Sequence, residues 1–449
     1  YQRHVEKCIE LAGNELVRTK NDAVFNASAR MYHRKFTECR DYFRDTAQRD
    51  LLSRFRALQR SGALELITSG ATHAYLPTMQ ESTRAVRAQI QIAVEEHERL
   101  LGAPPRGFWL PECGYYPGIE RFLHDNGISW FFLDSHGVLF AEPRPAYGLY
   151  APVFCTEAPV AAFGRDVESS RSVWSSDHGY PGDPDYREYY RDIGFDLDLD
   201  YIRPYIDPIG IRINTGVKYY RITGKTDEKE PYDYARACEK AKKHAADFIF
   251  NRCKQIDYLA AIMDRRPLIV APYDAELFGH WWYEGPQWLD QCIRLCAENQ
   301  RNLSLVTPSD YLAAYPTNQV CAPSLSSWGY AGYSQMWIDS TNDWIYRHLH
   351  SMERRMSALA CHHTKASPLV RRALNQMARE LLLAQSSDWA FIMKNKTMDN
   401  YARRRTREHI ANFHRLHDQI AACGIDESDV SDLESRNAIF PHIDYRTYA

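Results

Sequence analysis

The 449-residue sequence lacks the features that mark membrane, secreted and nucleic-acid-binding proteins. No apolar run approaches the roughly 20 residues that a membrane-spanning helix needs. The first 20 residues read as an amphipathic helix and not as a secretory signal. Lysines and arginines are interleaved with acids, and the formal net charge is −3, so neither nucleic acid nor a membrane is the expected partner. We therefore expect a cytoplasmic protein.

The sequence also lacks a CxxC pair, an internal repeat and a low-complexity tract. The cysteines number eleven, and the closest two, Cys292 and Cys296, lie one helical turn apart beside an apolar face. An odd count in a large chain argues against a disulfide scaffold. We expect reduced, mostly buried thiols in a reducing compartment.

Aromatic residues, in contrast, are abundant: 10 Trp, 29 Tyr and 18 Phe. Many belong to the core. A surplus of Trp and Tyr near polar, loop-like sequence is also typical of a sugar-binding cleft, because pyranose rings stack on aromatic faces while indole and phenol groups bond the hydroxyls.

The order of the predicted elements indicates a parallel α/β fold followed by a helical region. Three amphipathic helices precede Gly62, and the chain is helical again from about residue 335. Between about 164 and 232 the chain is rich in Tyr, Asp, Gly and Pro, so we expect a functional loop or lid there. Buried strands of a parallel sheet are predicted at 63–68, 107–111, 128–133, 266–271 and 302–306.

Ionisable residues follow several of these strands. Functional side chains of parallel α/β folds collect at the carboxyl ends of the strands. This rule selects His73, Glu112, Asp134 with His136, and Asp274.

Two of these acids stand in aromatic surroundings. Glu112 belongs to GFWLPECGYYPG at 107–118, and Asp274 to APYDAELFGHWWYEGP at 271–286. Glycoside cleavage needs two carboxyl groups at one glycosidic bond, one to attack the anomeric carbon and one to protonate the departing oxygen. Taken singly, each acid could instead cap a helix, and each Trp-rich stretch could be core. The pairing of two such acids favours glycoside chemistry.

The two strings, in this order, resemble the catalytic regions of glycoside hydrolase family 57, and most closely those of its 1,4-α-glucan branching enzymes. Further similar segments are GATH at 70–73, the stretch at 163–194, SSWGYAGYSQMWID at 326–339 and LLLAQSSDW at 381–389. The resemblance covers nearly the whole chain.

The resemblance implies roles for particular residues. Glu112 matches the nucleophile and Asp274 the general acid/base. Tyr180 lies in the segment that matches the loop of branching enzymes that covers the cleft and favours transfer over hydrolysis. The substrate-binding residues that it implies are His73, Trp109, Tyr180, Tyr220, His280, Trp281, Trp328, Trp337 and Asp388. No metal or organic cofactor is expected, since His73, His136 and His280 lack metal-ligand spacing.

The fold implied by the resemblance is an incomplete (β/α)7 barrel with a helical insertion and an all-helical carboxyl-terminal domain. The corresponding boundaries are 1–48 for the insertion, 49–322 for the catalytic barrel and 323–449 for the helical domain. Members of the family open with a strand bearing a His-x-His-Leu-Pro type motif. Because the sequence begins at Tyr1 inside the insertion, either that strand is missing from the printed sequence or the protein is naturally truncated.

The implied activity is a retaining double displacement on α-1,4-glucan, amylose or glycogen, which serves as both donor and acceptor. Its two carboxyl groups should lie about 5–5.5 Å apart. The alternatives within the family are an α-amylase and a 4-α-glucanotransferase. Outside this chemistry, the alternatives are a catalytically silent glucan-binding protein and a metal-dependent polysaccharide deacetylase. The sequence does not indicate an oligomeric state.

Overall fold

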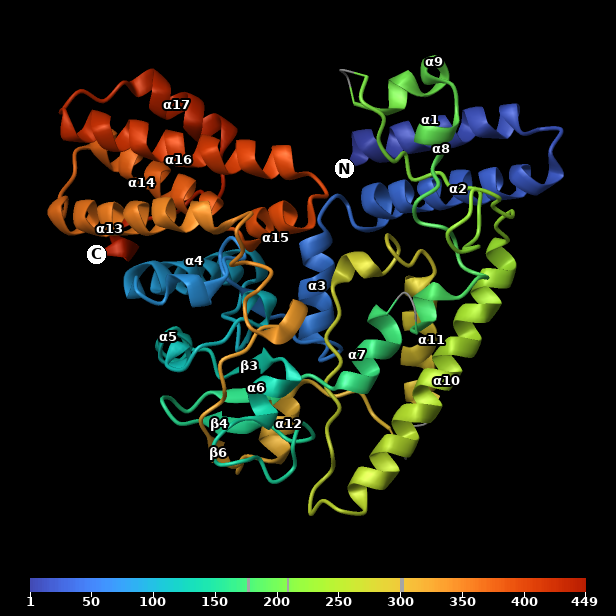
Figure 1. Ribbon diagram of the computed structural model, residues 1–449, viewed down its shortest axis with the longest axis horizontal. Coiled ribbons are helices and arrows are strands. Elements are labelled where there is room, and N and C mark those ends of the chain that lie inside the picture. Colours follow the sequence, from blue (N-terminus) through green and yellow to red (C-terminus); the bar gives the residue numbers. More distant parts are fainter. Residues whose placement is uncertain (176–177, 208–209, 299–302) are drawn as a thin grey trace. The chain divides into compact units, whose positions relative to one another are not determined.

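The computed structural model describes residues 1–175, 178–207, 210–298 and 303–449 (Figure 1). The chain forms two compact units, and each of them is built from two separate segments. The first unit comprises Tyr1–Ala57 and Asp166–Val306, and the second comprises Leu58–Arg165 and Thr307–Ala449.

The second unit contains a six-stranded mixed sheet in the order β1-β2-β3-β5-β4-β6. The first four strands in this order are parallel neighbours, whereas β4 runs antiparallel to β5 and parallel to β6. The central strands are short and almost entirely buried, which explains their continuous apolar sequence. The strands are β1 Thr68–Ser69, β2 Gly107–Trp109, β3 Trp130–Leu133, β4 Val153–Cys155, β5 Ala161–Gly164 and β6 Val320–Cys321.

The second unit also contains several helices. Ser367 caps α14 through the backbone N–H of Val370, as its sequence predicts, and Gly102 ends α4 in the left-handed conformation. The helices are α4 Thr83–Leu101, α5 Ile119–Asp125, α6 Ser135–Leu139, α12 Pro308–Ala314, α13 Tyr346–His362, α14 Pro368–Ala384, α15 Ser387–Asn395, α16 Asp399–Ala421 and α17 Glu427–Arg436. The predicted α/β class with an all-helical carboxyl-terminal region is confirmed (Figure 1).

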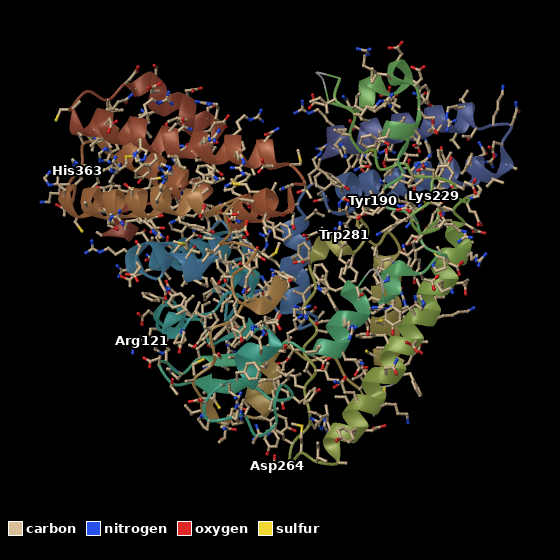
Figure 2. The ribbon with its side chains drawn as sticks, viewed as in Figure 1. Arg121, Tyr190, Lys229, Asp264, Trp281 and His363 are labelled. Atoms are coloured by element: carbon tan, nitrogen blue, oxygen red, sulfur yellow. The ribbon has the colours of Figure 1, made fainter. Side chains whose placement is uncertain are left out.

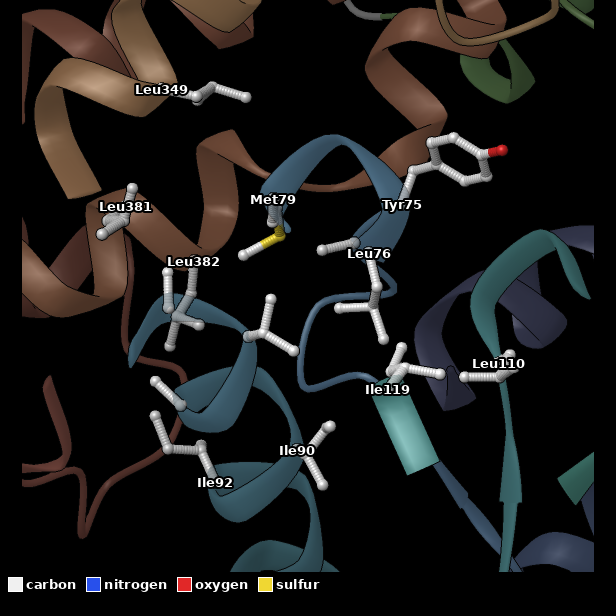
Figure 3. Packing of buried hydrophobic residues seen from close by; sticks show 14 of the residues in the cluster. Tyr75, Leu76, Met79, Ile90, Ile92, Leu110, Ile119, Leu349, Leu381 and Leu382 are labelled. Atoms are coloured by element: carbon white, nitrogen blue, oxygen red, sulfur yellow. The ribbon is translucent and has the colours of Figure 1, made fainter. Parts of the chain in front are cut away.

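One apolar core joins the sheet side of the second unit to its carboxyl-terminal helices. Leu76 and Met79, from the short turn η2 (Leu76–Met79), pack in the same cluster as Ile90 of α4 and Leu382 of α14 (Figure 3). Each such fully buried side chain contributes about 1.5–3 kcal/mol. The segment that carries His73 is therefore fixed against both α4 and α14.

The first unit is mainly helical. Its long helix α10 packs along α11, and α1 packs along α2. The aromatic core includes the buried rings of Trp282, Trp288 and Tyr186. The helices are α1 Gln2–Arg18, α2 Ala23–Asp41, α3 Leu51–Arg60 (which extends into the second unit), α7 Val167–Trp174, α8 Ile193–Asp196, α9 Leu199–Ile202, α10 Tyr234–Ala260 and α11 Gly285–Glu298, with short turns at η1 Tyr42–Thr46, η4 Tyr180–Gly182, η5 Arg203–Tyr205 and η6 Ala275–Leu277.

The predicted strands at 266–271 and 302–306 are wrong. Residues 266–271 and 303–306 have no strand assignment, and Asn302 lies outside the described residues. The backbone of Val270 accepts one hydrogen bond, from Asp166 N at 2.8 Å, and Leu305 is 67% exposed. A short apolar run does not by itself supply the neighbouring strand that a ladder needs. The strand predicted at 63–68 is likewise reduced to β1.

The polar segment 164–232 is more ordered than a bare loop. It contains α7, α8 and α9, and the buried carboxylate of Asp192 accepts bonds from the backbone of Gly194, Thr215 and Gly216. Residues 176–177 and 208–209 of this segment lie outside the described part.

Several sequence expectations concern the chain as a whole. All eleven cysteines are free; six are buried, two half-buried and three exposed. Among the described helices, none is long and apolar enough to cross a membrane. Within the described ranges, no group of three or more His, Cys, Asp or Glu side chains is suited to a metal ion.

Candidate active site

Glu112 lies in a strained turn directly after β2. The strand ends at Trp109, and the turn η3 (Pro111–Cys113) follows. Both Glu112 and Cys113 have positive φ, 63° and 49°. Left-handed backbone costs a residue with a Cβ about 1–2 kcal/mol, so two in succession require compensating contacts. The turn holds Glu112 in a nearly buried position, with the whole residue 8% exposed.

Two donors from distant parts of the sequence bond the two carboxylate oxygens of Glu112. The indole Nε1–H of Trp328 donates to Oε2 at 2.7 Å, and the hydroxyl of Ser387 donates to Oε1 at 2.7 Å. The backbone N–H of Trp328 also donates to the carbonyl of Glu112 at 2.9 Å. An indole nitrogen can only donate, so Oε2 is an acceptor here. The plane of the carboxylate is thus fixed at both oxygens.

His73 approaches the same carboxylate. Its Nε2 lies 3.8 Å from Oε1 of Glu112, and its Nδ1 lies 3.3 Å from the hydroxyl of Ser69. That hydroxyl donates its proton to the carbonyl of Trp109 at 2.9 Å. Since Ser69 must then accept from His73, the contact favours the tautomer with hydrogen on Nδ1. In neutral His73, Nε2 can therefore accept a hydrogen bond from a substrate hydroxyl.

Aromatic rings flank Glu112. Trp109 and Trp328 meet edge to face with centroids 5.0 Å apart, and both are half-buried. The guanidinium of Arg165 lies 5.5 Å from the centre of the Trp328 ring. Both indoles are therefore held in place while part of each surface stays accessible.

The prediction that Trp337 contacts substrate directly needs correction. Trp337 is 1% exposed and stacks on Tyr75 with centroids 4.5 Å apart. The Tyr75 hydroxyl and the Ser334 hydroxyl are 2.6 Å apart. Because its ring is enclosed by protein, Trp337 supports the segment that bears Trp328 and has no face available to a sugar.

A cavity of about 380 Å3 adjoins Trp328 in the second unit. Asp134 and His136 belong to its wall: Asp134 pairs with Arg165 at 3.2 Å, and His136 Nε2 contacts the carbonyl of Gly332 at 2.9 Å. The Asp134 carboxylate, 3.6 Å away, raises the pKa of His136. Burial opposes ionisation of Asp134, but His136 and Arg165 outweigh it and lower the pKa of Asp134. The cavity is lined by Asp134, His136, Phe140, Ser327, Trp328, Gly329, Ala331, Gly332 and Tyr333.

Asp274 belongs to the first unit. It is half-buried and stands immediately before the turn η6, where its carbonyl accepts from Leu277 N at 3.3 Å. His280 is exposed, and its Nε2 lies 3.2 Å from the hydroxyl of Tyr189. The neighbouring tryptophans differ: Trp282 is buried, whereas Trp281, which is labelled in Figure 2, is 51% exposed. Trp282 anchors this segment, and Trp281 is accessible to a ligand.

Tyr180 and Tyr220 also lie in the first unit. The Tyr180 hydroxyl donates to Asp247 of α10 at 2.7 Å, and its ring lies 4.7 Å from that of His244. Burial, with the bond to Asp247, raises the pKa of Tyr180. Tyr220 packs against Phe25, and the Arg191 guanidinium lies 5.1 Å from its ring centre. Tyr180 therefore couples its turn to α10, and both rings are partly accessible.

Ser387 is the main residue that sequence reasoning missed. Its neighbour Asp388 was selected instead; Asp388 is exposed and accepts from the Ser386 hydroxyl at 3.3 Å. The string LLLAQSSDW contains both serines, but no spacing rule links position 387 to position 112. Ser69, which orients His73 from four residues earlier in the chain, was also missed.

Comparison with known proteins shows the family to which the chain belongs. Residues 1–324 match glycosyl hydrolase family 57, and residues 348–448 match the description "1,4-alpha-glucan branching enzyme, C-terminal". The chain belongs to glycosyl hydrolase family 57.

Three relatives illustrate the similarity. The 1,4-alpha-glucan branching enzyme TK1436 of Thermococcus kodakarensis is 32% identical over 97% of this chain, which spans 65% of that protein's length. The crystal structure of the alpha-amylase AmyC from Thermotoga maritima matches this chain with 46% identity and a TM-score of 0.93. The match covers all of this chain and 85% of the AmyC chain. The branching enzyme from Pyrococcus horikoshii matches all of this chain and 82% of its own, with 31% identity and a TM-score of 0.88.

Proposed function

We propose that the protein is a 1,4-α-glucan branching enzyme with Glu112 as nucleophile and Asp274 as general acid/base. The observation that carries the proposal is the Glu112 carboxylate, nearly buried in a strained turn and bonded at both oxygens. Strained backbone of this kind clusters at functional sites, where it fixes a reacting group in one orientation.

The proposed reaction has two displacements. Glu112 attacks the anomeric carbon of an internal glucose, the α-1,4 bond breaks, and Asp274 gives its proton to the departing 4-oxygen. Asp274 then takes the proton from the 6-hydroxyl of a second chain, whose oxygen displaces Glu112 from the anomeric carbon. One α-1,4 bond is replaced by one α-1,6 bond with retained configuration. The predicted separation of about 5–5.5 Å between the two carboxyl groups stays a prediction.

The remaining residues are proposed to bind the glucan. His73 accepts from a hydroxyl of the sugar next to the scissile bond through Nε2, and Trp109 and Trp328 offer ring surface beside Glu112. Trp281, His280 and Asp388 are exposed, which suits direct contact with sugars. Tyr180 is proposed to lie in the segment that limits access of water, and Tyr220 is proposed to form a further aromatic subsite.

The specific rival is an α-amylase, because the Thermotoga maritima AmyC structure is 46% identical to this chain. Both activities share the first displacement and differ in whether water or a sugar hydroxyl attacks the glycosyl-enzyme. Branching is favoured by the match of residues 348–448 and by the named relatives from Thermococcus and Pyrococcus.

The finer assignments are also proposals. We assign residues 1–48 to a helical insertion, 49–322 to the catalytic barrel and 323–449 to the helical domain. The substrate is proposed to be cytoplasmic glycogen or amylose, and the process glycogen biosynthesis. The eleven free cysteines support a reducing compartment.

The test is incubation with amylose, followed by proton NMR for α-1,6 anomeric signals and by a reducing-end assay. Branching gives new α-1,6 signal with few reducing ends, and Glu112→Gln abolishes it. Reducing ends without α-1,6 signal would establish the amylase. Unchanged amylose would favour a glucan-binding protein.

A further inference from the structure

The carboxyl-terminal helical region reaches the candidate nucleophile through one side chain. Ser387 is the first residue of α15 and is 2% exposed. Its hydroxyl donates to Oε1 of Glu112 at 2.7 Å across 275 residues of sequence. Together with Trp328 on Oε2, it gives the carboxylate one fixed donor per oxygen.

A backbone contact sets the position of Ser387 relative to His73. The N–H of Ser387 donates to the carbonyl of His73 at 3.0 Å, and Ala74 and Ser386 form an antiparallel bridge. The two segments are therefore joined by an isolated bridge beside Glu112. A shift of either segment would move both His73 and Ser387.

A buried polar chain fixes the same segment from behind. The Gln385 side chain donates to Glu353 Oε1 at 2.8 Å and accepts from the side chain of Gln89 at 2.9 Å. Gln89 in turn bonds Thr72, directly before His73, at 3.1 Å through the Thr72 backbone N–H. Gln89, Gln385 and Glu353 are at most 4% exposed. Paired groups buried this deeply specify one arrangement, since any other leaves a buried donor or acceptor without a partner.

We propose that Ser387 is a positioning residue for Glu112, through which the helical carboxyl-terminal region takes part in the orientation of the nucleophile. The proposal rests on the proposed role of Glu112. In the first displacement Ser387 keeps the carboxylate plane aimed at the anomeric carbon. In the second, when the bond from Glu112 to the sugar breaks, the same hydroxyl donates to the negative charge that returns to the carboxylate.

The decisive measurement is kcat and KM on amylose for Ser387→Ala, Ser387→Thr and Ser387→Cys. Loss of a hydrogen bond to a charged group predicts a kcat about ten- to a hundredfold lower for Ser387→Ala, with KM changed by less than about twofold. Ser387→Thr, which keeps the hydroxyl, should restore most of kcat. Ser387→Cys keeps the volume with a weaker donor and should be slow even if the alanine variant does not fold.

Thr406→Val is the matched control. Thr406 is also buried in the carboxyl-terminal helices, but among the described residues its hydroxyl donates to the carbonyl of Ala402 within α16, at 2.9 Å, and not to Glu112. We expect wild-type kcat for this variant. Wild-type kcat in Ser387→Ala or Ser387→Cys overturns the proposal. So does a parallel loss of kcat, substrate affinity and melting temperature that threonine does not restore, because it would indicate a purely structural role.

Glu112→Gln separates this proposal from the proposed function. If Glu112→Gln is inactive while the Ser387 variants are fully active, Glu112 stands as nucleophile and only the positioning role fails. If Glu112→Gln stays active, the nucleophile assignment fails, and the role of Ser387 fails with it.

Discussion

His73 and Glu112 face each other across 3.8 Å, measured from Nε2 to Oε1, and both occupy left-handed backbone, with φ of 54° and 63°. Each residue lies in a turn after one of two neighbouring parallel strands, β1 and β2. Left-handed conformations are uncommon for residues with a Cβ and are maintained only where the surroundings enforce them. Each turn is held by a backbone hydrogen bond from a distant segment: Ser387 N–H donates to the carbonyl of His73, and Trp328 N–H donates to the carbonyl of Glu112.

Replacement of His73 by Asn separates the role of the ring from that of the turn. Asn tolerates positive φ, so the turn should persist, but its side chain cannot reproduce a ring nitrogen at the Nε2 position. We expect kcat/KM on amylose to fall about ten- to a hundredfold, the loss of roughly one hydrogen bond to substrate and its orienting effect. An unchanged kcat/KM would exclude contact between His73 and the sugar.

The anchoring of Tyr180 to α10 gives a test of the lid. Tyr180→Ala removes both the ring packing and the bond to Asp247, so water should reach the glycosyl-enzyme more readily. The ratio of new reducing ends to new α-1,6 linkages should rise at least about threefold, because a factor of this size corresponds to the free energy of one weak hydrogen bond. Tyr180→Phe, which removes only the hydroxyl, should give a smaller rise. Equal ratios in all three proteins would count against a lid.

Local sequence chemistry predicted the elements whose cause is local. The caps at Ser367, Gly62 and Gly102 lie where their residue types indicate, and Glu112 follows a parallel strand as expected. The rule about strand ends depends only on the strand itself. It therefore located Glu112 without any knowledge of the partners of Glu112.

The features that sequence reasoning missed depend on contacts between distant segments. Ser387 reaches Glu112 only because α15 begins beside the turn that carries His73. Trp337 looked like a cleft aromatic, but Tyr75 covers it. The run at 266–271 is apolar enough for a strand but has no strand assignment. In each case burial and pairing were decided by residues far away in the chain.

A buried carboxylate in the first unit predicts acid-sensitive stability there. Glu15 is fully buried and bonds Arg18 at 2.6 Å and the hydroxyls of Tyr201 and Tyr219 at 2.7 and 2.6 Å. Burial disfavours its charge, but Arg18 and the two phenols outweigh burial and lower the pKa of Glu15. The stability that this lowered pKa supplies is present above the unfolded-state pKa and is lost as the pH falls through the folded-state value.

Glu15→Gln should therefore lower the melting temperature at pH 7, by the equivalent of about 1.5–3 kcal/mol for hydrogen bonds to a charged group. The difference from wild type should shrink as the pH falls below 4.5, the ordinary pKa of the group. Melting followed by circular dichroism at pH 7 and at pH ~3.5 tests both points. A difference that grows on acidification would contradict the argument.

The pKa of Glu353, a residue behind the candidate active site, is shifted in the opposite direction to that of Glu15. Burial raises its pKa to about 7, against the smaller opposing effects of Gln385, Arg354 and Ser82. A folded-state pKa above the ordinary 4.5 means that the associated stability is complete below pH 4.5 and is lost as the pH rises towards 7. The span of the shift corresponds to a free energy on the order of 3 kcal/mol.

Glu353→Gln replaces the ionisable group by an amide that can still accept from Gln385. The variant should gain stability over wild type as the pH rises from about 4.5 to 8, by up to ~3 kcal/mol in the free energy of unfolding. Thermal melting at several pH values measures this gain, and Glu98→Gln, at an exposed acid of α4, should follow the wild-type curve throughout. Parallel curves for Glu353→Gln and wild type would mean that Glu353 ionises alike in the folded and unfolded chain. In that case Glu353 would be charged in the folded protein at pH 7, and water or a cation would have to reach it. The polar chain to Gln385 and Gln89 would then keep its arrangement with a charged group at its end.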